Sequence, residues 1–194
     1  MTKIPGRSCS ARNSRARSAC VRIVDSCLGV GFRKVYDQLR DRWRQPMTVR
    51  YLEDFAVGQK FASGRLRVDK ERIQAFAAEF DPQPFHLDDE AARGSIFKGL
   101  AASGWHTAAM TMRLLVDSEL KPAGGIVGAG FDEFRWPRPV RPGDELRVES
   151  EILEVRPSRS RPEQGMIKVR TTTYNQTGEA VQINVGNLVV PRRS

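Results

Sequence analysis

The sequence of 194 residues is long enough for one sizeable core, and its formal net charge of +9 first suggests a nucleic-acid-binding protein. The charge is concentrated at one end, because residues 1–46 hold eleven of the 32 basic residues and three of the 23 acidic ones. The nearly neutral remainder argues against a nucleic-acid partner.

Residues 1–46 are expected to form a basic extension to a single domain over residues 47–194. The extension is interpreted either as a disordered tail or as residues that precede a natural start at Met47. An organelle transit segment is a third reading, because the first 24 residues are rich in Arg and Ser and contain no acid. Its apolar stretch is too short for a membrane helix, so no membrane partner is expected.

The cysteines are confined to this extension. Cys9, Cys20 and Cys27 all precede residue 47, so the domain has no disulfide framework to support it. Thiols without such a framework are typical of a reducing compartment, and a cytoplasmic location is therefore expected.

The first part of the domain predicts a strand near residues 60–68 and then a helix. Asp69 is a candidate N-cap, and four apolar residues follow at helical spacing: Ile73, Phe76, Ala77 and Phe80. A short second helix is predicted over residues 88–93, where acids come first and Arg93 comes last.

Between these helices, Asp81-Pro82-Gln83-Pro84-Phe85-His86 places a carboxylate and an imidazole five residues apart. Each proline fixes its own φ and pushes the preceding residue toward extended backbone, so a rigid connecting loop is predicted. Rigid placement suits an acid-base pair. Taken alone, Asp81 could instead be an ordinary turn residue and His86 a structural histidine.

A central helix is predicted to begin near Ser103-Gly104 and to continue past Val116. A broad apolar stripe at helical spacing indicates that this helix is buried on several sides: Trp105, Ala108, Ala109, Met112, Leu115 and Val116. His106 is interpreted as a packing residue at the start of this helix.

Period-two patterns then predict strands near residues 126–136, 144–155, 166–174 and 179–190. In the last of these, Val181, Ile183 and Val185 alternate with Gln182 and Asn184, so the valines and isoleucine are expected on the buried face. One strand, then helices, then four strands indicates an α+β fold in which a curved antiparallel sheet wraps around the central helix.

From residue 47 onward the chain resembles the MaoC-like dehydratases, also called R-specific enoyl-CoA hydratases. The resemblance lies in the loop 81–88, the entry to the central helix at 102–106 and the segment 135–144. It implies a single hot-dog fold and a homodimer or a higher homo-oligomer. In two places the chain departs from the family pattern: Gln83 replaces the usual asparagine, and Ser103 replaces a frequent histidine.

The resemblance implies reversible syn hydration of a trans-2-enoyl-CoA to an (R)-3-hydroxyacyl-CoA. In this reading His86 deprotonates the attacking water, Asp81 delivers a proton to C2, and the N–H of Gly104 polarises the thioester carbonyl. The remaining candidates for substrate contact are Gln83, Ser103, Trp105, Arg138 and Arg141, the two arginines being candidates for binding the CoA phosphates.

Two other functions stay open at this point: a hot-dog acyl-CoA thioesterase and a non-catalytic acyl-CoA binding module. No cofactor is expected besides the CoA thioester itself, which is the substrate. No metal site is expected either, because the two histidines, His86 and His106, lack metal-ligand spacing.

Overall fold

The structure is a computed structural model that describes residues 49–193. The predictions made for residues 1–46, including their disorder, the start at Met47 and a transit segment, lie outside the described residues.

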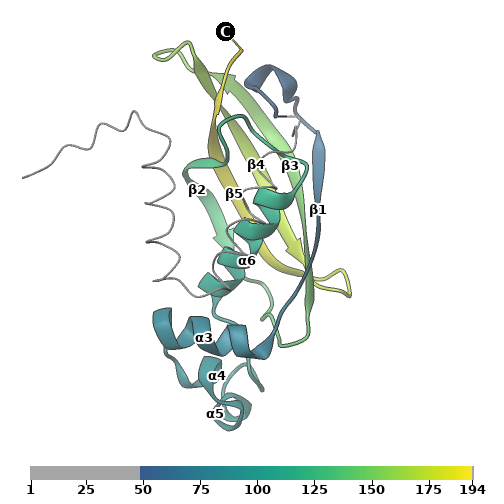
Figure 1. The fold of residues 1–194 in the computed structure, drawn as a ribbon, viewed down its shortest axis with the longest axis vertical. Coiled ribbons are helices and arrows are strands. Elements are labelled where there is room, and N and C mark those ends of the chain that lie inside the picture. Colours follow the sequence, from purple (N-terminus) through teal and green to yellow (C-terminus); the bar gives the residue numbers. More distant parts are fainter. Residues whose placement is uncertain (1–48, 194) are drawn as a thin grey trace, which may run out of the picture. The chain divides into compact units, whose positions relative to one another are not determined.

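The described chain forms an open five-stranded antiparallel sheet with helices at one face and one end (Figure 1). The spatial order of the strands is β1-β3-β4-β5-β2. The elements are the short 3-10 turn η1 (Leu52–Asp54), β1 (Lys60–Arg67), α3 (Lys70–Phe80), α4 (Pro84–Leu87), α5 (Asp89–Gly94), α6 (Gly104–Asp117), β2 (Val127–Arg135), β3 (Glu145–Pro157), β4 (Gln164–Tyr174) and β5 (Ala180–Pro191). The predicted strands and the α+β class are confirmed.

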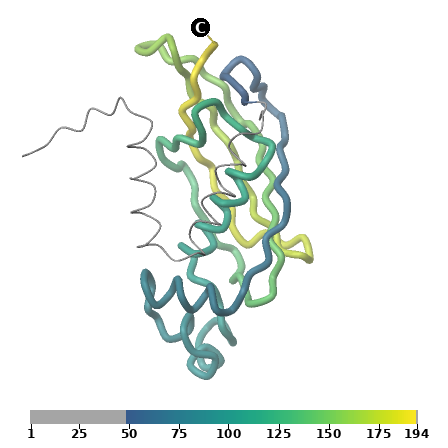
Figure 2. Tube along the Cα trace, viewed as in Figure 1, coloured from purple at the N-terminus to yellow at the C-terminus, as the bar shows by residue number. Residues whose placement is uncertain are grey.

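The central helix α6 lies across one face of the sheet, and α3, α4 and α5 gather beyond its N-terminal end (Figures 1 and 2). The core forms between α6 and the sheet, and it includes Leu114 of the helix and the β3 residues Leu146, Val148 and Ile152. Leu146 and Ile152 are fully buried, as the alternation in this segment predicts. The hydrophobic core therefore fixes α6, and with it the first turn of that helix.

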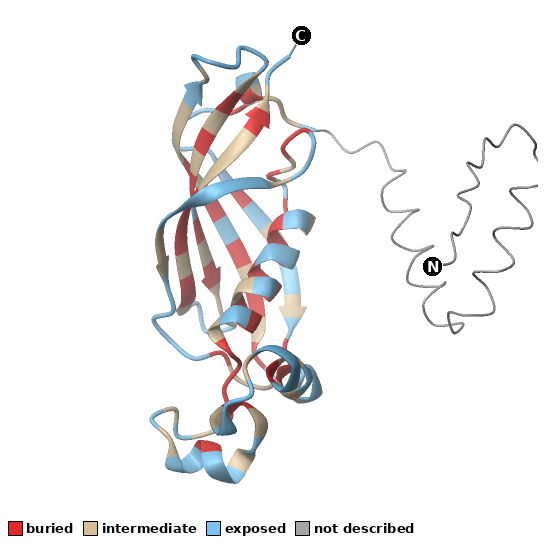
Figure 3. Cartoon of the chain, turned by 90° about the vertical axis from the view of Figure 1, so that its left-hand side faces the viewer, coloured by how far each residue is buried: buried red, intermediate tan, exposed pale blue. Residues whose placement is uncertain are grey.

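The predicted burial of α6 is confirmed for Leu115 but wrong for most of the stripe. Trp105 is 65% exposed and Met112 43% exposed, whereas Met110, Thr111 and Leu114 are buried. Figure 3 shows this division, with buried positions toward the sheet and exposed positions away from it. The stripe was ambiguous because nearly every position of this helix is apolar or small, so hydrophobicity alone does not select one face.

The prediction for β5 is half right, because Val181 and Val185 are buried as expected but the opposite face is buried as well. Gln182 and Asn184 were expected opposite the buried face, but they are 1% and 5% exposed. They pair directly with Thr173 and Thr171 of β4, and directly paired residues share a face of the sheet. Since Thr173 bonds to Thr111 of α6, that face is the one beneath the helix.

The helix predicted to follow Asp69 is confirmed as α3, although the Asp69 side chain makes no capping hydrogen bond. The second helix is α5, and Asp88 caps it by accepting from the backbone N–H groups of Glu90 and Ala91. The loop between them contains an unpredicted helical turn, α4, with Pro84 in its first turn, a position where the absent proline N–H costs nothing. Among residues 49–193, no helix combines the length and the apolar character that a membrane span requires.

Candidate active site

Two short elements bring Asp81 and His86 together. Asp81 is the C-cap of α3, with its backbone N–H bonded to the carbonyl of Ala77, and it departs from helical geometry before Pro82. His86 lies within α4, which turns its ring back toward Asp81. The separation between His86 Nε2 and Asp81 Oδ2 is 3.4 Å. The five-residue spacing thus produces a real pair, through a turn of helix rather than an extended loop.

The other ring nitrogen of His86 determines the chemistry of the pair. His86 Nδ1 lies 2.8 Å from the carbonyl oxygen of Ala101. A carbonyl only accepts, so Nδ1 carries the proton and donates it, and in the neutral ring Nε2 presents its lone pair toward Asp81. Two acceptors that face each other across 3.4 Å are suited to sharing a water or a transferable proton.

Asp81 is kept ionised. The hydroxyl of Ser103 and then the amide of Gln83 lower the pKa of Asp81 below its usual range, partial burial opposes them, and a protonated His86 adds a smaller lowering effect. The Gln83 amide donates to Asp81 Oδ1 at 2.7 Å, so Oδ2 stays available to face His86. The glutamine at this position therefore orients the carboxylate.

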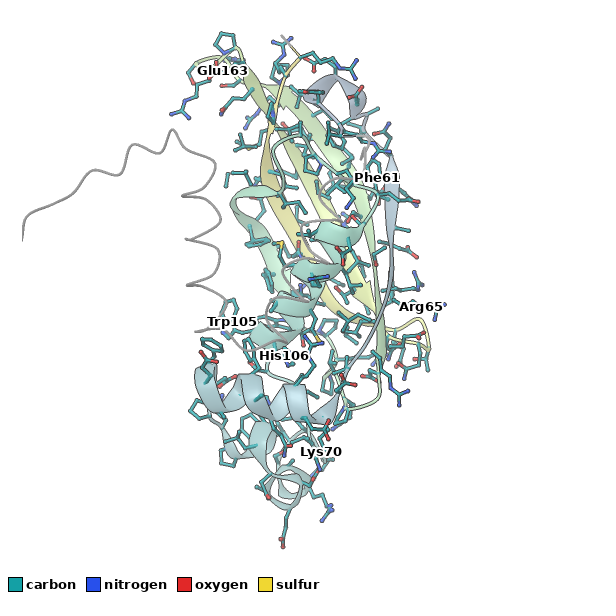
Figure 4. All side chains as sticks on the ribbon, in the orientation of Figure 1. Phe61, Arg65, Lys70, Trp105, His106 and Glu163 are labelled. Carbon is teal, nitrogen blue, oxygen red and sulfur yellow. The ribbon has the colours of Figure 1, made fainter. Side chains whose placement is uncertain are left out.

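The first turn of α6 supplies a backbone donor beside the pair. Ser103 is the N-cap, and its hydroxyl accepts from the N–H of Trp105 at 3.2 Å. Gly104 is the first helical residue, and within residues 49–193 its N–H donates to no protein acceptor, as expected at a helix start. Figure 4 shows the neighbouring Trp105 and His106 at this end of the helix, next to α3.

The indole ring of Trp136 packs against Gly104. An added Cβ at this glycine would lie 3.0 Å from two atoms of the Trp136 indole, so no larger residue fits without movement of that ring. The indole Nε1 donates to Gln182 Oε1 at 3.0 Å, which holds the ring in place. Trp136 belongs to the segment 135–144 that carries part of the family resemblance, yet no role was predicted for it, because Gly104 is distant from it in the sequence and no local pattern indicates their contact.

These groups line one pocket of about 500 Å³, which contains Asp81, His86 and Gly104. Phe85 and Phe97 pack around the imidazole, with ring centroids 4.6 Å and 6.0 Å from it. His86 is buried, whereas the Asp81 side chain is 19% exposed, so a ligand in the pocket meets the carboxylate first.

The structure brings most of the predicted substrate residues to the same pocket. Gln83, Ser103, Trp105 and Arg138 line it, and Arg138 is exposed and paired with Glu179 at 3.2 Å. Arg141 does not line it. Its guanidinium donates to the carbonyls of Phe97, Gly99 and Leu100, so it holds the segment before α6 in place.

Among the described residues, no three His, Cys, Asp or Glu side chains lie close enough together to hold a metal ion. His106 is outside the pocket; it is buried, and its ring stacks on Phe76 with a centroid distance of 4.7 Å.

Comparison with known proteins gives consistent results. The profile of the MaoC-like domain matches residues 54–175. The uncharacterized protein YdeM of Bacillus subtilis is 37% identical over 139 residues, which cover 72% of this chain and 96% of YdeM. The crystal structure of a MaoC-like dehydratase from Rhodospirillum rubrum is 59% identical, with a TM-score of 0.73, and the match covers 75% of this chain and 99% of that one. The R-hydratase PhaJ1 of Pseudomonas aeruginosa, in its unliganded form, is 28% identical with a TM-score of 0.58, over 74% of this chain and 86% of its own.

Proposed function

This chain belongs to the MaoC-like domain family and has its hot-dog fold, and from that premise we propose that it is a hydro-lyase that adds water reversibly to a trans-2-enoyl-CoA. The observation that carries the proposal is the pairing of His86 Nε2 with Asp81 Oδ2 beside the free N–H of Gly104. The R-hydratase among the similar structures supports the same reaction class.

In the proposed reaction a water in the pocket donates hydrogen bonds to both His86 Nε2 and Asp81 Oδ2. Its oxygen attacks C3 of the enoyl group while His86 accepts one of its protons, a role that the lone pair on Nε2 allows. The proton passes through Asp81 to C2 on the same face, so H and OH add syn and the pair returns to its starting state. The product is the (R)-3-hydroxyacyl-CoA.

Negative charge develops on the thioester oxygen as C3 is attacked. We assign the N–H of Gly104 to this oxygen, because it is the first N–H of α6 and the helix dipole adds to its positive character. One preorganised donor of this kind contributes about 3 kcal/mol to a transition state.

The test is the loss of ultraviolet absorbance of the conjugated thioester when crotonyl-CoA is added to the full-length protein. A general acid-base group contributes about 100-fold to 10,000-fold, so the Asp81→Asn and His86→Ala variants should each lose at least about 100-fold in kcat/KM. The matched control is His106→Phe, which replaces the other histidine outside the pocket and should retain activity.

Parallel thiol detection separates the two enzymatic readings. Release of free CoA would indicate a thioesterase, whereas loss of absorbance without thiol release supports hydration. Wild-type activity in both pocket variants would refute the proposed roles. Binding of the thioester without turnover would indicate a non-catalytic module.

We also propose a homodimer, supported by the surface that β2 and α6 leave uncovered. Within residues 49–193, β2 has a partner on one side only, and its residues Val127 and Phe131 are 52% and 57% exposed. Trp105 and Met112 of α6 expose further apolar area nearby. An open strand edge with apolar neighbours is a pairing surface. The cytoplasmic location stays a prediction.

A further inference from the structure

A band of polar side chains lies beneath α6, where a hydrophobic core would be expected. Thr173 of β4 pairs with Gln182 of β5, and the next pair on the same face of the sheet is Thr171 with Asn184. All four are at most 5% exposed. A polar group that loses water without gaining a partner is costly, so such a band requires partners.

Part of the band is satisfied within the protein. Thr173 bonds to Thr111 of α6 at 2.7 Å, and Gln182 Oε1 accepts from the indole of Trp136. Thr171 bonds to Ser150 at 3.4 Å. In the described part of the chain, Gln182 Nε2 and the side-chain amide of Asn184 have no hydrogen-bond partner within the protein, and they are not sealed from solvent, because His106 Nδ1 is the only fully buried side-chain polar atom there without a partner.

Both amides line a groove between α6, β2 and β5 that encloses about 170 Å³. Trp105 lines this groove and also the pocket that holds Asp81 and His86, so the two spaces adjoin at that ring. Trp136 connects them from the other side, because its ring packs on Gly104 while its Nε1 bonds to Gln182. A group that extends beyond the reacting carbons would reach the amides here.

We propose that Gln182 and Asn184 bind the distal end of the acyl group and select a short acyl chain that bears an uncharged hydrogen-bond acceptor, a hydroxyl or a carbonyl oxygen. The inference rests on the proposed hydratase function. Gln182 Oε1 already accepts from Trp136, so its NH₂ group is the donor left without a partner and the ligand atom that meets it must accept, while Asn184 can both donate and accept.

Size and charge limit the chain further. A cavity of about 150 Å³ holds a benzene ring, so this groove holds about six heavy atoms. The residues that line it include no Asp, Glu, Lys, Arg or His. A carboxylate on the acyl group would therefore be buried without a counter-charge, which is strongly unfavourable.

The test compares two pairs of substrates in which a hydroxyl replaces a terminal methyl group of similar size. One pair is trans-4-hydroxy-2-butenoyl-CoA and trans-2-pentenoyl-CoA, and the other is trans-5-hydroxy-2-pentenoyl-CoA and trans-2-hexenoyl-CoA. In at least one pair the wild-type protein should favour the hydroxyl member by about twofold to tenfold in kcat/KM, the effect of one hydrogen bond. The ratio of the kcat/KM values for the two members of a pair is independent of the amount of active protein.

The Asn184→Leu variant should reverse this preference, because leucine has a similar size and presents only an apolar wall. The matched control is Leu188→Ile, on the same strand and in the same groove, which should keep the wild-type ratio. The wild-type ratios test the inference even if a variant fails to fold.

Three outcomes are decisive against the inference. It is overturned if the methyl member is favoured in both pairs, if Asn184→Leu keeps the wild-type ratio, or if fumaryl-CoA, which carries a carboxylate, exceeds the hydroxyl substrates. In each case hydration itself still occurs, so the proposed function stands. Absence of hydration with every substrate, crotonyl-CoA included, overturns the function and the inference together.

Discussion

Replacing Gly104 with alanine tests whether its contact with Trp136 supports catalysis. The new Cβ would lie 3.0 Å from Cδ2 and Cε2 of the indole and 3.2 Å from Cζ2. Carbon atoms in contact prefer about 3.5 to 4.0 Å, so the ring must retreat by about 0.5 to 1 Å. The backbone N–H of residue 104 is retained, so any loss of rate reports position and not the absence of the donor.

The free energy of unfolding should fall by about 1 to 3 kcal/mol. Overpacking costs about 1 to 3 kcal/mol, and loss of the 3.0 Å bond from Trp136 to Gln182 costs about 0.5 to 1.5 kcal/mol more. The higher helix propensity of alanine offsets up to about 1 kcal/mol of this. A displacement of about 1 Å at a catalytic donor can cost about 100-fold, so kcat should fall by about tenfold to 100-fold.

Urea unfolding and crotonyl-CoA hydration measure the two effects separately. The matched control is Gly94→Ala at the end of α5, where the added Cβ meets no atom within 4 Å. That variant should keep wild-type kcat and gain up to about 1 kcal/mol in stability. If Gly104→Ala loses stability but keeps wild-type kcat, the contact between Gly104 and Trp136 serves packing alone and does not position the N–H for catalysis.

Two further predictions concern stability and assembly. Burial, and then the charge of Arg72, lower the pKa of His106 below its ordinary value of 6.5. Below that pH the unfolded chain binds a proton that the folded one does not, so stability should decline as pH falls, by up to about 1.4 kcal/mol per pH unit. Urea unfolding of His106→Phe should show a shallower decline; an unchanged decline would contradict this cause. Val127→Asp on β2 should convert a dimer into a monomer in analytical ultracentrifugation, whereas Val57→Asp, at a site 67% exposed and outside β2 and α6, should not. A wild-type monomer would refute the dimer.

Local patterns located the elements well. The strands near residues 60–68, 126–136, 144–155, 166–174 and 179–190 all exist, and Asp81 and His86 form the pair that their spacing suggested. These features depend on neighbours in the chain: side-chain alternation, proline geometry and capping. The helical turn α4 escaped detection because four residues are too few to show a period.

The sequence by itself therefore determined the order and kind of the elements and the rigid setting of Asp81 and His86. Tertiary structure alone decided which way the side chains on these elements face. The carbonyl of Ala101, fifteen residues from His86, engages Nδ1 and leaves Nε2 as the ring nitrogen that faces Asp81. Pairing with β4 turns Gln182 and Asn184 toward α6, against the expectation from alternation. Both outcomes depend on contacts between distant segments of the chain. A shift of one residue along a strand exchanges the residues on its two faces. When both faces are partly buried, local hydrophobicity does not specify which residues point toward the helix.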